Sequence, residues 1–319
     1  MRDLILFGDC KQNLSAFLPN TARTCVTSPP YYGLRDYGGE DKQIGQENTP
    51  EEYIQNLVEV FREVREVLTD DGTLWVNIGD SYYNYRPGKA YVKQTVASTN
   101  QDLPEYSPKR SRKLDGIKEK DLIGIPWMLA FALRADGWYL RQDIIWHKPN
   151  PMPESVKDRC TKSHEYIFLL SKNKRYYYDN ESIKEPAKDW GTRDRTNGKY
   201  HNQGTGLQPH SGLQKSYSTK NKRSVWSVTN KPYKGSHFAV FPPDLIEPCI
   251  LAGSEEGDCV VDPFMGSGTT AMVAKALGRD YIGCELHEDY GNLIQKRIGE
   301  YKPVHKVSQE HTINILDII

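Results

Sequence analysis

Residues 259–285 constrain the fold of this chain more than any other segment. Apolar runs predict strands at Cys259–Asp262 and Tyr281–Glu285, and helical spacing predicts a helix between them at about Thr269–Leu277. A glycine-containing turn separates the first strand from the helix. This order predicts an α/β fold with a parallel sheet, in which the turn is the place where nucleotide-like ligands meet exposed backbone N–H groups.

The glycine turn favours a nucleoside ligand that carries no phosphate. Gly266 and Gly268 lack the third glycine of a dinucleotide fingerprint, and the Gly-Lys-Ser/Thr ending of a P-loop is missing. Glu285 lies about 20 residues beyond Gly266, the spacing at which an acid meets ribose hydroxyls. S-adenosylmethionine therefore fits this turn better than a pyrophosphate or a triphosphate. A tight turn without a ligand is the alternative interpretation.

The rest of the chain, which has 319 residues in all, continues the alternation of strands and helices. Thr49 is expected to cap a long helix, because Glu52 follows three residues later and apolar residues recur at helical intervals. Strands are predicted at residues 3–9, 23–30, 73–81, 138–148 and 164–172, and further helices at 10–20 and 125–136. This pattern predicts a mostly parallel sheet covered by helices.

Two polar stretches, at about 84–120 and 184–234, interrupt the regular pattern. The first is expected to be a mobile loop, because it lacks sustained periodicity. The second is rich in Lys and Arg, and its acidic residues are Glu185, Asp189 and Asp194. The net charge of the chain is +0, so a nucleic-acid footprint must be local, as in this stretch. A solvated surface loop is the alternative.

The sequence also indicates where the protein works. Its 6 cysteines show no C-x-x-C spacing, which argues against a structural zinc site and favours buried thiols in a reducing compartment. The apolar run at Leu4–Phe7 is too short for a signal peptide. No segment approaches the roughly 20 apolar residues of a membrane span. We therefore expect a cytoplasmic protein that binds no membrane.

The stretch "VTSPPYYGLRDYG" places two prolines directly after an apolar run. Pro29 and Pro30 lack backbone N–H donors and fix their own φ angles, so the segment is stiff and extended. It can hold the Ser28 hydroxyl, the Pro29 carbonyl and the Tyr31 ring in fixed relative positions. A simple turn after a strand would explain the prolines alone.

Two motifs resemble those of a known family. "TSPPY" (27–31) and "DPFMGSGTT" (262–270) resemble the catalytic and cofactor motifs of DNA amino-methyltransferases, which methylate cytosine at N4 or adenine at N6. The catalytic motif comes first, as in the permuted β group of these enzymes. The resemblance extends to "LFGDC", "LWVNIGDS", "IIWHKPNPMPESVKDR" and "KGSHFAVFPPDLI".

The resemblance implies a Rossmann-like class I S-adenosylmethionine-dependent methyltransferase fold. In such a fold a mostly parallel sheet has helices on both faces, and here the motif order is circularly permuted. The catalytic half would be residues 1–183, with the mobile loop at about 84–120. Residues 184–234 would be a small inserted target-recognition region, and residues 235–319 the cofactor-binding half.

The resemblance also implies roles for individual residues. The catalytic residues would be Ser28, Pro29, Pro30 and Tyr31. The cofactor S-adenosylmethionine would be bound by Asp9, His237, Phe238, Asp262, Phe264, Gly266, Gly268 and Glu285. The polar basic stretches and the segment after Trp146 would contact DNA through Lys109, Arg110, Arg112, Lys148, Arg193, Arg195, Lys220, Lys222 and Arg223. Asp9 could instead cap the helix that starts at Cys10, and Phe238 could be a core residue.

The chemistry of the substrate explains the catalytic motif. The lone pair of an exocyclic amine is delocalised into the base, so two acceptors beside the amine, on Ser28 and Pro29, would orient and activate it. The base must leave the duplex to be reached, and Tyr31 would stack on it. The partner is therefore double-stranded DNA. A cognate restriction endonuclease, and a monomeric or homodimeric state, are left open.

A serine before Pro-Pro-Tyr is more typical of cytosine-N4 enzymes, which makes cytosine the expected target base. Adenine N6 is the alternative. A methyltransferase for a protein amide or an RNA base is disfavoured. Those enzymes that have an Asn-Pro-Pro-Tyr motif place it after the glycine turn, whereas this chain has Ser28 and places the motif before the turn. An inactive DNA-binding relative is disfavoured because both motifs and Glu285 are intact.

Overall fold

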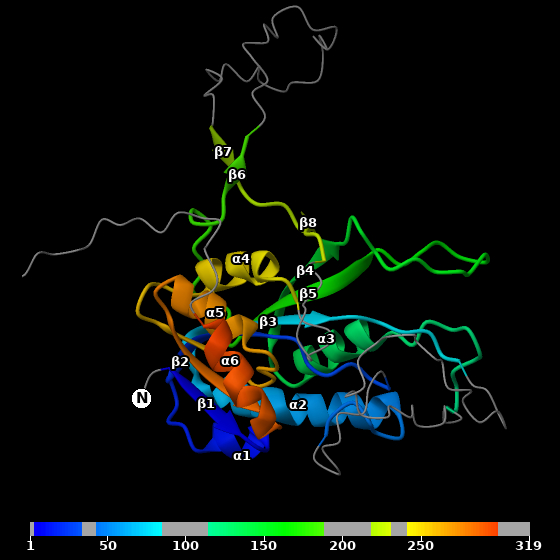
Figure 1. Cartoon of the computed structure of the whole chain (residues 1–319), viewed down its shortest axis with the longest axis horizontal. Coiled ribbons are helices and arrows are strands. Elements are labelled where there is room, and N and C mark those ends of the chain that lie inside the picture. Colours follow the sequence, from blue (N-terminus) through cyan, green and yellow to red (C-terminus); the bar gives the residue numbers. More distant parts are fainter. Residues whose placement is uncertain (1–2, 34–42, 85–113, 188–217, 231–240, 299–319) are drawn as a thin grey trace, which may run out of the picture.

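A single eight-stranded sheet forms the centre of the molecule (Figure 1). The computed structural model describes residues 3–33, 43–84, 114–187, 218–230 and 241–298. The strands of this sheet are β1 (Leu4–Phe7), β2 (Ala22–Thr27), β3 (Leu68–Ile78), β4 (Tyr139–His147), β5 (His164–Ser171), β8 (Val225–Ser227), β9 (Cys259–Asp262) and β10 (Asp280–Glu285). Their order across the sheet is β1-β10-β9-β2-β3-β5-β4-β8.

The sheet is mostly parallel, as the sequence predicts. Strands β1, β10, β9, β2 and β3 pair in parallel, whereas β5 pairs antiparallel with both of its neighbours, β3 and β4. The carboxyl ends of β1, β2, β9 and β10 therefore meet at one edge of the sheet. Ligands of open α/β sheets bind outside such an edge.

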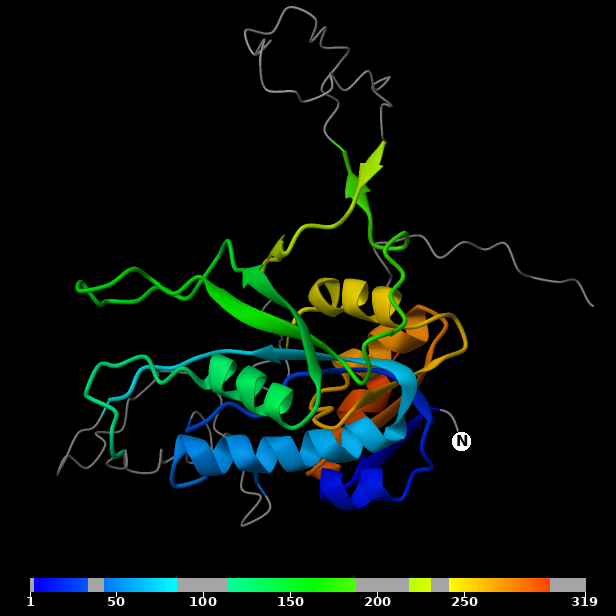
Figure 2. The same cartoon turned by 180° about the vertical axis from the view of Figure 1, so that it is seen from behind.

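Helices cover both faces of the sheet (Figures 1 and 2). One face carries α1 (Cys10–Ser15), α2 (Pro50–Val67) and α3 (Ile125–Ala135), and the other carries α4 (Pro243–Gly253), α5 (Thr269–Ala276) and α6 (Gly291–Arg297). Each face has its own core of buried apolar side chains. The two-faced α/β architecture expected from the sequence is confirmed.

The long helix α2 shows why local sequence predicts these elements well. Thr49 caps it, and the Thr49 hydroxyl accepts a hydrogen bond from the Glu52 N–H at 3.1 Å. The buried side chains of α2, which include Tyr53, Leu57 and Phe61, recur every three or four residues and face the sheet. The capping and the periodicity both agree with the prediction.

The predicted insertion at 184–234 is built into the fold in two ways. β6 (Glu185–Pro186) and β7 (Thr219–Lys220) pair as a short antiparallel arm that projects from the body (Figure 1). β8, by contrast, pairs in parallel with β4 and forms an edge of the main sheet. Part of the predicted insertion therefore belongs to the main sheet.

The predicted loop at about 84–120 is described only at its ends. Leu114 is buried, and its N–H donates to the Tyr83 hydroxyl at 3.0 Å. Lys120 N–H donates to the Tyr83 carbonyl. The end of the predicted loop is therefore fixed against Tyr83, while residues 85–113 lie outside the described residues. Among the described helices, none is long and apolar enough to cross a membrane.

Candidate active site

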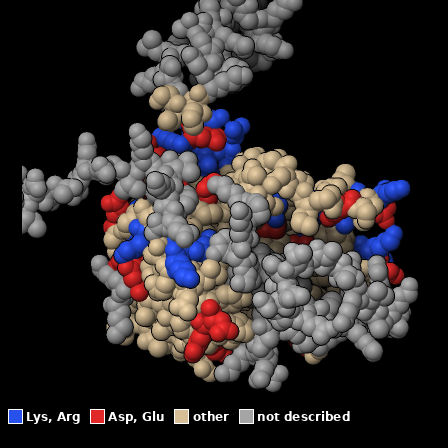
Figure 3. Space-filling view, in the orientation of Figure 1, with Lys and Arg blue, Asp and Glu red and all other residues tan. Residues whose placement is uncertain are grey.

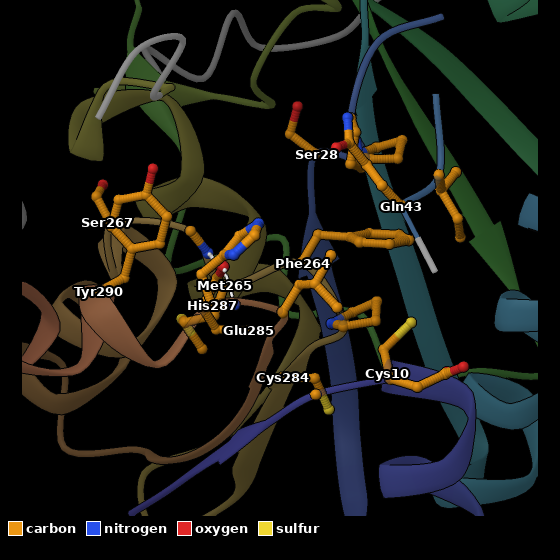
Figure 4. Close-up of a pocket in the computed structure, with 18 of the residues that line it drawn as sticks. Cys10, Ser28, Gln43, Phe264, Met265, Ser267, Cys284, Glu285, His287 and Tyr290 are labelled. Carbon is orange, nitrogen blue, oxygen red and sulfur yellow. Dashed lines mark hydrogen bonds between the residues drawn. The ribbon is translucent and has the colours of Figure 1, made fainter. Parts of the chain in front are cut away.

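A cavity of about 320 Å³ opens at the carboxyl edge of the parallel strands. Its walls come from segments that follow β1, β2, β9 and β10. Figure 4 shows Ser28 and Gln43 on one side of it, Ser267 and Tyr290 on the other, and Phe264 between them. The volume is within the range of small-molecule sites. We call the side formed by residues 263–267, Thr269, residues 285–287 and Tyr290 the cofactor wall, and the side formed by Ser28–Tyr31 the base wall.

The turn of the cofactor wall requires its two glycines. Gly266 and Gly268 have φ angles of +54° and +81°, which side chains disfavour. A Cβ on Gly268 would also lie 2.7 Å from Ile294 Cγ2 of α6. The buried Arg297, also from α6, donates to the Ser267 carbonyl at 2.9 Å and to the Thr269 hydroxyl at 3.1 Å. Helix α6 thus fixes the turn from behind.

Glu285 joins the two parts of the cofactor wall. Its Oε2 accepts the Gly266 N–H at 2.8 Å, and its Oε1 accepts the His287 N–H at 3.1 Å. Burial raises the pKa of Glu285 to about 7, and the two backbone hydrogen bonds act in the opposite direction. Each oxygen keeps a lone pair that can accept a hydroxyl of a ligand.

Two of the predicted cofactor residues do not line the cavity. Asp262 is fully buried, and its carboxylate accepts hydrogen bonds from the Thr27 hydroxyl at 2.5 Å, the Thr270 hydroxyl at 2.6 Å and the Phe264 N–H at 2.9 Å. Burial raises the pKa of Asp262 to about 6, and these donors lower it. Asp262 therefore ties β2 to α5, and Gly268 shapes the turn beneath the cavity.

The residues of the cofactor wall fit S-adenosylmethionine. Glu285 offers acceptors for ribose hydroxyls, and Phe264, Pro263 and Leu286 give an apolar surface for an adenine ring. Among the described residues, His287 Nε2 is buried at this wall without a hydrogen-bond partner, so it can contact a polar atom of a ligand. Asp9 lines the cavity and also caps α1, because its Oδ1 accepts the Lys11 N–H at 2.8 Å. Both interpretations of Asp9 are therefore compatible with its position.

The base wall is held by side chains from distant elements. Ser28, Pro29, Pro30 and Tyr31 all line the cavity. The Pro30 carbonyl accepts the Tyr53 hydroxyl of α2 at 2.8 Å, and the Tyr31 hydroxyl donates to Glu165 Oε2 of β5 at 2.7 Å. Hydrogen bonds to α2 and β5 thus hold the Pro30 carbonyl and the Tyr31 hydroxyl in place.

The predicted DNA contacts differ in their surroundings. Lys148 forms an ion pair with Glu165, and its side chain is only 17% exposed, so in this structure it is not presented to a phosphate. Lys220 and Arg223 both pair with Glu185 at the base of the arm, where Figure 3 shows basic and acidic atoms side by side. The ammonium of Lys222 lies 5.0 Å from the centre of the Trp226 ring.

The remaining predicted residues lie outside the described part of the chain. They are His237 and Phe238 of the cofactor set and Lys109, Arg110, Arg112, Arg193 and Arg195 of the DNA set.

Three residues of the site were missed by the sequence analysis. Glu165 is an acid near the start of strand β5, whose central residues are apolar, and that exception to the pattern was an available signal. His287 follows Glu285 in the cofactor wall, but nothing in its spacing marks it. Arg297 has no local signal, because its partners lie in a turn about 30 residues earlier.

Comparison with known proteins decides the family. The family model described as "DNA methylase" matches residues 22–296. This chain belongs to the DNA methylase family. The methylase is 48% identical to the Type II methyltransferase M.SmaI of Serratia marcescens over 92% of this chain and 90% of that protein. It is 46% identical to the Type II methyltransferase M.Cfr9I of Citrobacter freundii, over 91% and 86% of the two chains.

Solved structures share the fold of the methylase. The PvuII DNA methyltransferase (cytosine-N4-specific) has a TM-score of 0.62 at 19% identity, over 93% of this chain and 86% of the other. The M1.HpyAVI complex with S-adenosylmethionine has a TM-score of 0.52 at 18% identity, over 92% and 98%. The expected Rossmann-like methyltransferase fold is confirmed.

Proposed function

We propose that this DNA methylase transfers a methyl group to the N4 amine of cytosine within a specific sequence of duplex DNA. The observation that carries the proposal is that the base wall and the cofactor wall line one cavity. Ser28 and Glu285 thus face a common space, although they come from opposite ends of the chain. Such a cavity can hold a methyl donor and an amine together.

The chain's own residues orient the amine. Ser28 Oγ and the Pro29 carbonyl are acceptors that two N–H groups of one amine can meet at the same time. Their pull localises the nitrogen lone pair and aims it, which is catalysis by orientation and electrostatics. S-adenosylmethionine supplies an electrophilic methyl group. No cysteine nucleophile is needed, and burial raises the pKa of Cys10, which lines this cavity, to about 12.

The choice of cytosine rests on Ser28 at the first position of the Ser-Pro-Pro-Tyr motif. Adenine N6 is the alternative target, for which an aspartate or asparagine is more typical at this position. The PvuII DNA methyltransferase, which shares the fold, is cytosine-N4-specific. The Type II relatives favour a cognate restriction endonuclease as partner. The proposed site of action is the cytoplasm of a prokaryotic or viral host cell.

Nucleoside analysis tests this function. The purified protein is incubated with S-adenosylmethionine and duplex DNA, and the digested DNA is examined by mass spectrometry. N4-methylcytosine is the expected product. N6-methyladenine alone would overturn the choice of base, and the absence of any methylated base in genomic DNA of expressing cells would overturn the proposal itself.

A salt titration tests the proposed DNA contact of the arm. Lys222→Met removes one cation beside Trp226, and it should lower the slope of log affinity against log salt by about 0.9. Lys184→Met is a matched control, because Lys184 already pairs with Glu181 at 2.7 Å. Equal slopes for Lys222→Met and the wild type would argue against this contact.

A further inference from the structure

The turn of the cofactor wall uses its own backbone donors. Four of its N–H groups donate to a carboxylate or a carbonyl of the protein at 2.8–2.9 Å, and they belong to Phe264, Met265, Gly266 and Gly268. The expectation that a ligand meets exposed N–H groups of this turn therefore does not hold for these four. Acceptor atoms of a ligand that lie along them must find their donors on side chains.

Glu285 alone cannot complete the hydrogen bonds of a ribose. Each ribose hydroxyl donates one proton and accepts at its oxygen. The ionised carboxylate of Glu285 accepts the N–H groups of Gly266 and His287, at 2.8 Å and 3.1 Å, and its remaining lone pairs can accept hydroxyl protons. It has no proton to give. The hydroxyl oxygens therefore need a donor from another group of the wall.

His287 carries a nitrogen in the right place to be this donor. Among the described residues, its Nε2 is buried without a hydrogen-bond partner, and the residue lines the cavity. Its ring packs edge-on against Tyr290, with the ring centres 6.2 Å apart and the planes at 79°. Figure 4 shows His287 next to Glu285, between Ser267 and Phe264. The ring is thus held where Glu285 meets a ligand.

We propose that His287 is a cofactor-binding residue whose Nε2–H donates to a ribose hydroxyl of S-adenosylmethionine, while Glu285 accepts hydroxyl protons of the same sugar. The inference rests on the proposed function, because that function requires S-adenosylmethionine at this wall. A donor and an acceptor side by side match the two roles of a hydroxyl group. A deoxyribose would leave one of them without a partner, so the pair also selects for a ribonucleoside.

Two replacements of His287 test the contact. His287→Phe keeps a ring against Tyr290 but removes both nitrogens, and calorimetry should show S-adenosylmethionine bound about fivefold more weakly, the effect of one lost hydrogen bond. His287→Gln places an amide N–H near the position of Nε2, and its affinity should stay within about twofold of the wild type. His164→Phe, the same replacement in β5, is the control and should leave the affinity unchanged.

Nucleosides identify the part of the ligand that His287 contacts. 5′-Methylthioadenosine keeps the ribose but lacks the amino acid, so His287→Phe should weaken its binding by the same factor of about five. One of its 2′-deoxy and 3′-deoxy forms should bind to His287→Phe and to the wild type within about twofold, because the hydroxyl that His287 meets is absent. A loss with S-adenosylmethionine alone would place the contact at the amino acid, and a full loss with both deoxy forms would place it at adenine. Either result overturns the proposal.

Thermal unfolding separates binding from folding. A buried polar atom without a partner lowers the stability of the ligand-free protein, so His287→Phe should have a Tm equal to or above that of the wild type. A Tm lower by more than about 2 °C would show that His287 supports the fold, and it would overturn the proposal. Equal affinity of His287→Phe and the wild type for S-adenosylmethionine would also overturn it. In all these cases the wild type still binds the cofactor and methylates DNA, whereas failure of the proposed function leaves the wild type without product.

Discussion

The two walls of the cavity are built in different ways. The cofactor wall is a local structure: Glu285 binds backbone N–H groups of Gly266 and His287, within one strand–turn–helix–strand unit. The base wall is held by side chains from afar, since the partner of Tyr31 is 134 residues away. The first can therefore form from nearby sequence, whereas the second exists only when the whole sheet is assembled.

Asp262 lies between the two walls, and its removal should have the largest effect. Asp262→Ala leaves the Thr27 hydroxyl, the Thr270 hydroxyl and the Phe264 N–H without their common acceptor. Buried donors left unpaired cost about 1–3 kcal/mol each. Because the Thr270 hydroxyl can still donate to the Val26 carbonyl at 3.3 Å, the free energy of unfolding should fall by about 3 kcal/mol. Thermal or urea denaturation measures this. Unchanged stability would mean that the walls are held together by other contacts.

Ser28→Ala should impair the function of the base wall and leave that of the cofactor wall unchanged. One acceptor for the amine is lost while the two prolines keep the frame, so methyl transfer should slow by about 10- to 100-fold, or about 1.4–2.7 kcal/mol. Calorimetry should give an unchanged affinity for S-adenosylmethionine. A large loss of cofactor affinity would show that the walls are not independent.

Glu285→Gln should have the opposite effect, because it should weaken cofactor binding rather than slow methyl transfer. It replaces a charged acceptor for ribose hydroxyls by a neutral one, and we expect S-adenosylmethionine to bind about tenfold more weakly, because hydrogen bonds to charged groups contribute about 1.5–3 kcal/mol. The rate at saturating cofactor should change little. Glu288→Gln, on the neighbouring 3₁₀ turn η2 (Glu288–Tyr290), is the matched control.

The smallest effect should be a pH dependence confined to the cofactor wall. The pKa of Glu285 is raised from 4.5 to about 7, and ribose donors favour its ionised form. Affinity for S-adenosylmethionine should therefore rise severalfold between about pH 6 and pH 8. The stability of the ligand-free protein should show the opposite trend with pH. The folded state holds this proton more tightly than the unfolded state, so the contribution of Glu285 to stability is lost as the pH rises from 4.5 to about 7.

Glu285→Gln also serves as the control for this pH experiment. Its affinity for S-adenosylmethionine should be nearly flat over the same range. If the affinity of the wild type is equally independent of pH, then another group at the cofactor wall has the role proposed for Glu285.

The same difference between the walls explains what the sequence could predict. The bounds of β9, α5 and β10 agree with the prediction within a residue or so, because glycines and apolar periodicity mark them locally. The order of strands across the sheet, and the antiparallel position of β5, depend on packing between distant segments. For that reason Tyr31 was found from its motif, but its partner Glu165 was not.

The predicted roles of Asp262 and Lys148 show a second limit. A motif identifies residues near a site, but the contacts decide what each can do there. Asp262 has its carboxylate filled by donors of the protein, and Lys148 has its charge paired. Neither fact can be predicted from the motif, because only the fold brings the partners Thr27, Thr270 and Glu165 close to these two residues.

The parallel pairing of β8 with β4 bears on exchanging sequence specificity between related methylases. The Ile145 N–H donates to the Ser224 carbonyl at 2.8 Å, and the Val228 N–H donates to the His147 carbonyl at 3.1 Å. A chimera that replaced all of residues 184–234 would exchange these bonds together with the arm that is proposed to contact DNA, and a mismatched donor segment would leave the β4 edge without its partner strand. A chimera whose foreign segment ends before residue 218 keeps the native edge strand β8 and its hydrogen bonds to β4.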